Sequence, residues 1–161
     1  MKRISTFLFA STLAIASLSS CSSDDNSSAP QPQPQPTNLL LGKWEMRKMD
    51  MKMEMGGNVL IDEQDVDTKT AGIKIEYDFK ADNTVEYYMY TPATQQQAEQ
   101  EQSGTATYTR NGDEITMTIS TPTTYTIKVL NSTELHLNMY QEEEVNGSQT
   151  KIDITQKFTK M

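Results

Sequence analysis

Apolar and polar residues exchange places at every second position over most of the chain after Trp44. Segment 73–79 has Ile, Ile, Tyr and Phe at its odd-numbered positions with Lys, Glu and Asp between them, and segments 115–119 and 134–139 repeat this alternation. A period of two is typical of a β-strand with one buried and one solvated face. The chain after Trp44 is therefore predicted to be all-β.

Turn-forming sequences separate the alternating segments. Asn111-Gly112 and Asn146-Gly147 favour tight hairpins, and Ala81-Asp82-Asn83 marks a further short connection. A helical turn is expected over 37–41, capped by Thr37 or Asn38, and a polar loop or short exposed helix over 91–103. The eight or nine predicted strands are about 43–55, 58–66, 70–80, 84–91, 104–110, 114–121, 123–130, 134–144 and 149–159.

Strands that follow one another through tight turns favour an antiparallel up-and-down meander. One apolar face per strand suits a closed barrel or a sandwich, and a barrel of about eight strands removes exposed edges. The first strand changes phase, because Trp44 and Met46 are even-numbered whereas the methionines from Met49 to Met55 are odd-numbered. Both sets face inward only if one residue is inserted near Arg47-Lys48, so a β-bulge is predicted there.

Gly42-Lys43-Trp44, at the start of the first predicted strand, resembles the Gly-x-Trp motif of the lipocalins. LLGKWEM, IEYDFKADNTVEYY, GTATYTRNGDEITMTI and LHLNMY are similar to the lipocalin-like domains of small bacterial lipoproteins, over nearly all of 39–161. The resemblance implies a small up-and-down barrel with a binding role and no enzymatic activity. It also implies that Trp44 packs across the barrel bottom beneath a basic residue of the last strand, Lys157 or Lys160.

The first 20 residues have the features of an export signal. Met1-Lys2-Arg3 supplies positive charge, and segment 4–18 is apolar but too short and too weakly hydrophobic for a transmembrane span. Leu18-Ser19-Ser20-Cys21 resembles the lipobox of bacterial lipoproteins. We therefore expect cleavage before Cys21 and lipid attachment to its thiol, with acyl chains such as palmitate holding the protein on a membrane.

The residues after Cys21 predict where the protein is held. Ser22-Ser23-Asp24-Asp25 resembles the surface-export signal of Bacteroidota-type lipoproteins, which implies an outer-membrane location, on the periplasmic or the outer face. Alternating Pro and Gln up to Pro36 disfavour helix and sheet and predict an extended spacer. The predicted domains are thus a signal peptide at 1–20, a lipidated tether at 21–37 and a lipocalin-like barrel at 38–161.

Charge and residue counts argue against several classes of activity. The 161-residue chain carries 14 basic and 22 acidic side chains, and loss of Lys2 and Arg3 would leave 12 basic and 22 acidic, a net charge of −10. An acidic surface repels phosphate backbones, so no nucleic-acid partner is expected. One lipidated Cys and one His leave no nucleophile–histidine pair, so neither an enzyme nor a cofactor is predicted.

Methionine is concentrated in the first predicted strand, at Met46 and from Met49 to Met55. Thioethers are soft ligands that select Cu(I), but flexible methionines also fill cores and line adaptable cavities, and we favour the second interpretation. His136 falls on the outer face of its strand by parity, and the acidic segment 62–67 lacks the Gly and terminal Glu of a calcium loop. No metal site is predicted.

Small eight-stranded barrels either hold one ligand or fill themselves with side chains. The favoured hypothesis is a membrane-anchored lipocalin-like protein that binds a small apolar or amphipathic molecule at the cell envelope. The alternative is a filled barrel that serves as a protein-interaction module, an accessory subunit of an envelope complex. If a cavity exists, its predicted lining consists of the large inward-facing residues Trp44, Met51, Met53, Tyr87, Met89, Tyr125 and Met139.

Overall fold

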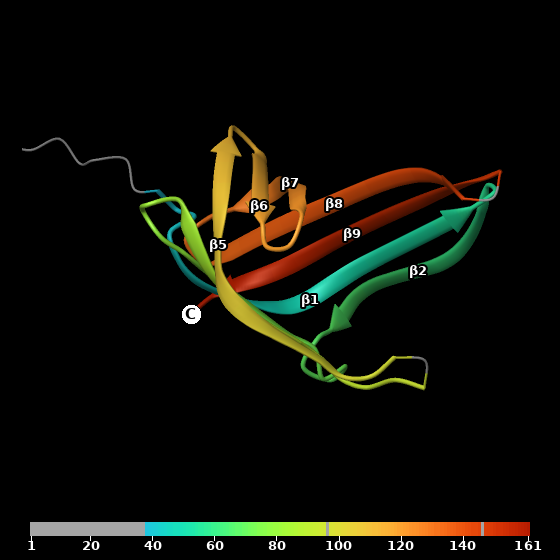
Figure 1. Ribbon diagram of the computed structural model, residues 1–161, viewed down its shortest axis with the longest axis horizontal. Coiled ribbons are helices and arrows are strands. Elements are labelled where there is room, and N and C mark those ends of the chain that lie inside the picture. The colour runs from blue at the N-terminus through green and yellow to red at the C-terminus, as the bar shows by residue number, and fades with distance from the viewer. Residues whose placement is uncertain (1–37, 96, 146) are drawn as a thin grey trace, which may run out of the picture. The chain divides into compact units, whose positions relative to one another are not determined.

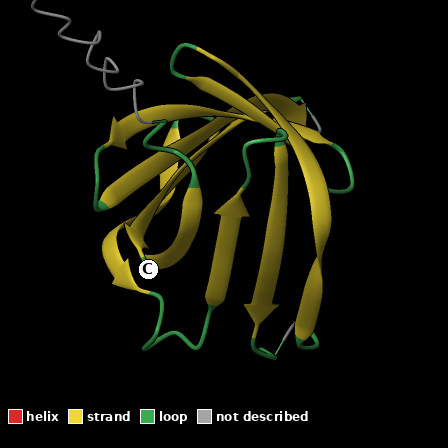
Figure 2. Ribbon diagram, turned by 90° about the vertical axis from the view of Figure 1, so that its left-hand side faces the viewer, coloured by secondary structure: helices red, strands yellow, loops and turns green. Residues whose placement is uncertain are grey.

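A computed structural model describes residues 38–95, 97–145 and 147–161. The predicted signal peptide and tether, including Cys21, lie outside these residues. The described part consists of strands joined by turns and loops, with no helix (Figure 2). Its strands are β1 (Gly42–Met55), β2 (Asn58–Asp67), β3 (Lys74–Phe79), β4 (Thr84–Thr91), β5 (Gln100–Asn111), β6 (Glu114–Thr118), β7 (Pro122–Leu130), β8 (Glu134–Val145) and β9 (Ser148–Lys160).

Eight of these strands close into an antiparallel barrel. β3 to β9 pair in chain order, and β1 closes the ring by pairing with β3 on one edge and β9 on the other. β2 is an additional strand that continues past β3 along the same edge of β1. Figure 1 shows β8, β9, β1 and β2 running side by side, while β5 curves from β4 towards β6. The predicted up-and-down barrel of about eight strands is confirmed.

Most strand bounds agree with the prediction, but β3 begins at Lys74 instead of residue 70, β6 ends at Thr118 instead of residue 121, and β5 differs as well. It begins at Gln100, where a polar loop or short helix was expected, and Gln100 to Ser103 pair with the end of β4. Pairing with a neighbouring strand outweighs the weak β-propensity of Gln and Glu. The expected capped turn is present, because the Leu41 N–H donates to the Asn38 carbonyl (3.1 Å) and the Leu40 N–H donates to Asn38 Oδ1 (3.2 Å).

The hydrophobic core fills one end of the barrel, which we call the closed end. Tyr77 stacks obliquely against Phe158 with ring centroids 5.3 Å apart, and Phe79 meets Tyr108 edge-on at 5.1 Å. Within the described residues these side chains form one continuous cluster. The buried core residues are Leu40, Trp44, Met46, Tyr77, Phe79, Val85, Ala106, Tyr108, Ile115, Met117, Ile127, Leu135, Leu137 and Phe158.

Trp44 seals the closed end together with the turn that precedes β1. Its side chain is fully buried, and the indole Nε1 donates to the Leu40 carbonyl at 2.8 Å. Of the two candidate lysines, Lys160 supplies the cation: its Nζ lies 4.9 Å from the centre of the Trp44 ring and donates to the Leu39 carbonyl at 3.2 Å. The expected contact between the tryptophan and the last strand is therefore present.

The predicted β-bulge lies at Arg47. Met46 pairs with Phe158 and Lys48 with Lys157, so Arg47 is the extra residue in β1. Thr68, which follows β2, fills the adjoining space: its hydroxyl donates to the Met46 carbonyl (2.9 Å) and its N–H donates to the Arg47 carbonyl (3.1 Å). The bulge keeps the later methionines of β1 on the same face as Met46.

Candidate functional site

The inner face of the barrel continues beyond the core towards the β1–β2 and β8–β9 hairpins. Cross-strand pairing and alternation place the side chains of this region on the same face as the buried core residues. Every one of them keeps partial contact with solvent. We call this set the open-end face: Met49, Met51 and Met53 of β1, Tyr87 and Met89 of β4, Tyr125 of β7, Met139 of β8, and Ile152, Ile154 and Gln156 of β9.

Three strands bring the aliphatic part of the open-end face together. Ile154 pairs with Met51 on one side and with Met139 on the other. Ile152 pairs with Met53. Direct cross-strand partners on one face of an antiparallel sheet have Cβ atoms about 5 Å apart, so these side chains contact one another. The result is a flexible apolar surface that the barrel leaves partly open to solvent.

Aromatic side chains form the opposing part of the open-end face. Tyr87 lies over its cross-strand partner Gly104, where an added Cβ would come within 3.1 Å of the Tyr87 hydroxyl. The Gln102 carboxamide donates to that hydroxyl at 3.4 Å. Deeper in the barrel, burial and a hydrogen bond with Tyr125 raise the pKa of Tyr77. Glycine thus leaves room for Tyr87 to lie flat against the wall of the barrel.

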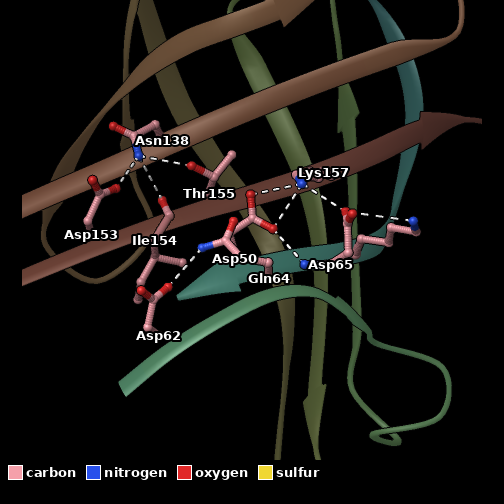
Figure 3. Close-up of polar contacts among 10 residues, drawn as sticks. Asp50, Asp62, Gln64, Asp65, Asn138, Asp153, Ile154, Thr155 and Lys157 are labelled. Carbon is pink, nitrogen blue, oxygen red and sulfur yellow. Dashed lines mark hydrogen bonds and ion pairs between the residues drawn. The ribbon is translucent and has the colours of Figure 1, made fainter. Parts of the chain in front are cut away.

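A polar cluster on the outer face fixes β1, β2 and β9 to one another at this level (Figure 3). Lys157 Nζ lies 2.8 Å from Asp50 Oδ2 and 2.8 Å from Asp65 Oδ1. Asp50 Oδ1 also accepts the Asp65 N–H at 2.8 Å. Asp65 has a φ of 52° and sits in an irregularity of β2 opposite Asp50. We call Asp50, Asp65 and Lys157 the outer clasp.

The charges of the outer clasp stabilise one another. Burial disfavours the Asp50 carboxylate, but the Asp65 N–H and the Lys157 ammonium outweigh it and hold the pKa of Asp50 below its ordinary value. The hydrogen bond from Lys157 and the attraction to its charge lower the pKa of Asp65. The hydrogen bonds to Asp50 and to Asp65 raise the pKa of Lys157. All three groups are therefore charged at neutral pH.

The family model for the lipocalin-like domain matches residues 40–137, which is more than half of the 161 residues. The chain belongs to the lipocalin-like domain family. No curated protein matches it.

Similar solved structures include two complexes of bovine odorant binding protein. The complex with a selenium-containing odorant is 17% identical with a TM-score of 0.46, covering 81% of this chain and 77% of that chain. The complex with undecanal is 13% identical with a TM-score of 0.44, covering 83% of this chain and 77% of that chain.

The lipocalin-like barrel divides the predicted cavity residues between its two ends. Trp44 lies in the core of the closed end, away from solvent. The other six, Met51, Met53, Tyr87, Met89, Tyr125 and Met139, all belong to the open-end face. Sequence reasoning did not single out Gln156, although a signal was present: it is a polar residue at an inward position between Ile154 and Phe158.

Two hollows of about 390 and 300 Å³ lie away from the open-end face of the lipocalin-like barrel, whereas a hollow of about 210 Å³ includes Tyr87 in its lining. One of about 390 Å³ lies beside the amino-terminal turn, between Leu39, Arg110 and Lys128. Another of about 300 Å³ lies on the outer face beside His136 and Lys157. Neither of the two larger hollows is lined by the methionines of β1, which are partly exposed to solvent.

Several polar features of the lipocalin-like barrel lie on its surface. His136 pairs with Lys157 on the outer face, and the acidic residues from Asp62 to Asp67 are exposed on β2. Among the described residues, no group of three or more His, Cys, Asp or Glu side chains is placed to hold a metal ion. The same residues include no helix with the length and apolar character needed to cross a membrane.

Proposed function

We propose that this protein is a lipid-anchored carrier or receptor that binds a small apolar or amphipathic molecule on the open-end face of its lipocalin-like barrel. The observation that carries the proposal is the uneven filling of the barrel. Core side chains pack the closed end completely, whereas inward-facing methionines, isoleucines and tyrosines at the other end remain partly exposed. Small-ligand sites are lined mainly by apolar and aromatic side chains with a few polar groups, and the open-end face has this composition.

The composition of the open-end face favours an adaptable ligand site. Met51, Met53 and Met139 are unbranched, with several rotatable bonds and a polarizable sulfur, so they adjust to ligands of different shape. Tyr87 and Tyr125 supply flat apolar rings with a polar tip. An apolar ligand seated there removes surface from water on both partners, which supplies the driving force for binding.

The position of the amino terminus suits an anchored binding protein. The described chain begins at Asn38, in the turn that closes the barrel beneath Trp44. A tether that runs from a lipidated Cys21 therefore joins the barrel at its closed end.

A second candidate function is that of a protein-interaction module. Val59 and Leu60 of β2 are exposed to 54% and 57%, and Tyr140 of β8 to 54%. In the described barrel, β2 pairs only with β1, which leaves its other edge unpaired. An exposed apolar edge strand is a surface on which a partner strand can add.

Titration of the apolar fluorophore N-phenylnaphthylamine tests the ligand proposal. The protein used is the chain without residues 1–20 and with Cys21→Ser, which keeps every core residue of the described barrel. We expect saturable enhancement of fluorescence, and Met51→Glu should weaken it about tenfold or more, because it places a charge among apolar side chains. Val59→Glu is the matched control and should leave dye binding unchanged. Absence of saturable dye binding to the unaltered protein would reject the ligand proposal. If the unaltered protein binds an envelope protein and the Val59→Glu variant does not, the interaction module is favoured.

Metabolic labelling tests the anchor. When the full chain is produced in a bacterium supplied with labelled palmitate, the label should appear on the protein and the protein should sediment with the outer membrane. Since Cys21 is the only cysteine, Cys21→Ser should abolish both. An unlabelled protein, or a Cys21→Ser variant that still sediments with the outer membrane, would contradict lipid anchoring at this residue.

A further inference from the structure

A polar side chain with apolar neighbours interrupts the aliphatic part of the open-end face. Gln156 pairs with Leu137 of β8 on one side and with Met49 of β1 on the other. Its neighbours on the same face of β9 are Phe158 and Ile154. Gln156 is therefore surrounded by apolar residues where the packed core meets the open end.

The carboxamide oxygen of Gln156 has no hydrogen-bond partner in the described structure. The atom is shielded from solvent, yet no donor reaches it. A buried polar atom without a partner is costly and uncommon in folded proteins, so each case calls for an explanation. An apolar residue at this position would avoid that cost.

A second atom of the same kind lies on the same face of the same strand. Among the described residues, the buried side-chain oxygens and nitrogens that lack a partner are those of Gln156 and of Thr150. Thr150 shares the parity of Ile152, Ile154 and Gln156, so all four face the same side of β9. Unpaired acceptors at both ends of an apolar stretch indicate that this face meets a molecule with polar groups.

We propose that Gln156 selects the ligand by accepting a hydrogen bond from a hydroxyl or other donor on an otherwise apolar molecule. The ligand class is thus an amphipathic molecule with a donor, such as a long-chain alcohol, in preference to a hydrocarbon or an ether. The inference deepens the proposed function and rests on it. The apolar body of the ligand lies along Met51, Ile154 and Met139, and its donor points towards the closed end.

Two isomeric ligands test this selection on the unaltered protein. Dodecanol and methyl undecyl ether have the same atoms and nearly the same length, but only the alcohol has a hydrogen-bond donor. Each displaces bound N-phenylnaphthylamine in a competition titration. We expect dodecanol to bind about tenfold more tightly, which is the scale of one hydrogen bond to a buried acceptor.

Variants assign the preference to Gln156. Gln156→Leu and Gln156→Met remove the acceptor, and Met keeps the unbranched shape of Gln, so a folded variant is available if Leu packs poorly. Circular dichroism verifies the fold of each. Both variants should bind the two isomers with nearly equal affinity. Gln149→Leu, the same change at an exposed position on the opposite face of β9, is the control and should keep the preference for dodecanol.

The outcomes separate this inference from the proposed function. If the unaltered protein binds the dye and both isomers equally well, or prefers the ether, the role of Gln156 is rejected while ligand binding stands. If Gln156→Met retains the tenfold preference, another group selects the donor and the inference is again rejected. If neither the dye nor the isomers bind, the proposed function itself fails.

Discussion

The variant Asp50→Asn measures how much the outer clasp, which joins β2 to β1 and β9, contributes to the free energy of unfolding. The substitution removes one charge and nearly preserves the shape of the side chain. In the unaltered protein the Asp65 N–H donates to Asp50 Oδ1 at 2.8 Å, and the carboxamide oxygen of the variant can still accept this hydrogen bond. The attraction between Asp50 and Lys157 is lost. The variant therefore isolates the contribution of charge.

The expected loss of stability follows from the two contacts. A partly exposed ion pair contributes about 0.2–1 kcal/mol, and a hydrogen bond to a charged group is stronger than one to a neutral group by about 1 kcal/mol. The Asp50 and Lys157 side chains are 20% and 23% exposed, so solvent screens both terms. We expect unfolding to become easier by about 1 kcal/mol, which for a domain of this size lowers Tm by roughly 4 °C.

The effect should depend on pH in a defined direction. Because the pKa of Asp50 in the folded protein lies below its ordinary value of 3.8, its stabilisation is fully present above that value and is lost as the pH falls through the folded pKa. The pKa of Lys157 is raised above 10.5, so its contribution persists until the pH rises beyond that value. The Tm difference between the unaltered protein and Asp50→Asn should thus be constant near neutrality and shrink below about pH 4.

Calorimetry of both proteins across this pH range is the assay. Asp62→Asn is the matched control, because Asp62 is exposed and its side chain accepts from the exposed Gln64 at 3.2 Å, so Tm should change by less than about 2 °C. Equal Tm values for Asp50→Asn and the unaltered protein at neutral pH, or a difference that persists undiminished at about pH 3, would refute the reasoning.

Three further substitutions probe the ends of the barrel. Lys160→Met should cost about 1 kcal/mol by removing the cation over the Trp44 ring, as measured by urea unfolding followed through the single tryptophan. Thr68→Val should cost about 1–2 kcal/mol in the same assay, because it leaves a carbonyl in the β1 bulge without its donor. Gly104→Val should displace the Tyr87 ring and weaken binding of N-phenylnaphthylamine severalfold with a smaller effect on Tm; unchanged dye binding would contradict the placement of Tyr87 in the site.

The strands and the bulge could be predicted because they leave local traces in the sequence. Alternation fixes which face of each strand is buried, and the shift in methionine parity after Met46 required one inserted residue, which the structure places at Arg47. The start of β5 left no such trace. Gln100 to Ser103 carry no alternation of apolar residues, and only their pairing with β4 makes them a strand.

The polar contacts were harder to predict from the sequence for a physical reason. The outer clasp joins Asp50 to Lys157 across 107 positions of sequence and depends on a left-handed Asp65, which no local pattern specifies. Gln156 differs, because a polar residue at an inward position is visible in the sequence. That its oxygen is shielded and unpaired depends on the surrounding barrel.

The contrast between the two ends of the barrel explains how one small domain can be stable and still keep an apolar face partly open. Aromatic rings and branched aliphatic side chains have few rotamers and pack the closed end densely, so this end stabilises the folded domain. Methionine loses more side-chain entropy when it is ordered, by up to about 1.5–2 kcal/mol, so Met51, Met53 and Met139 gain less from packing on one another than leucines would. The same flexibility lets them conform to ligands of different outline, whereas the carboxamide oxygen of Gln156 pairs only with a hydrogen-bond donor. We therefore expect affinity to vary little with the shape of the apolar body and strongly with the presence of one hydroxyl.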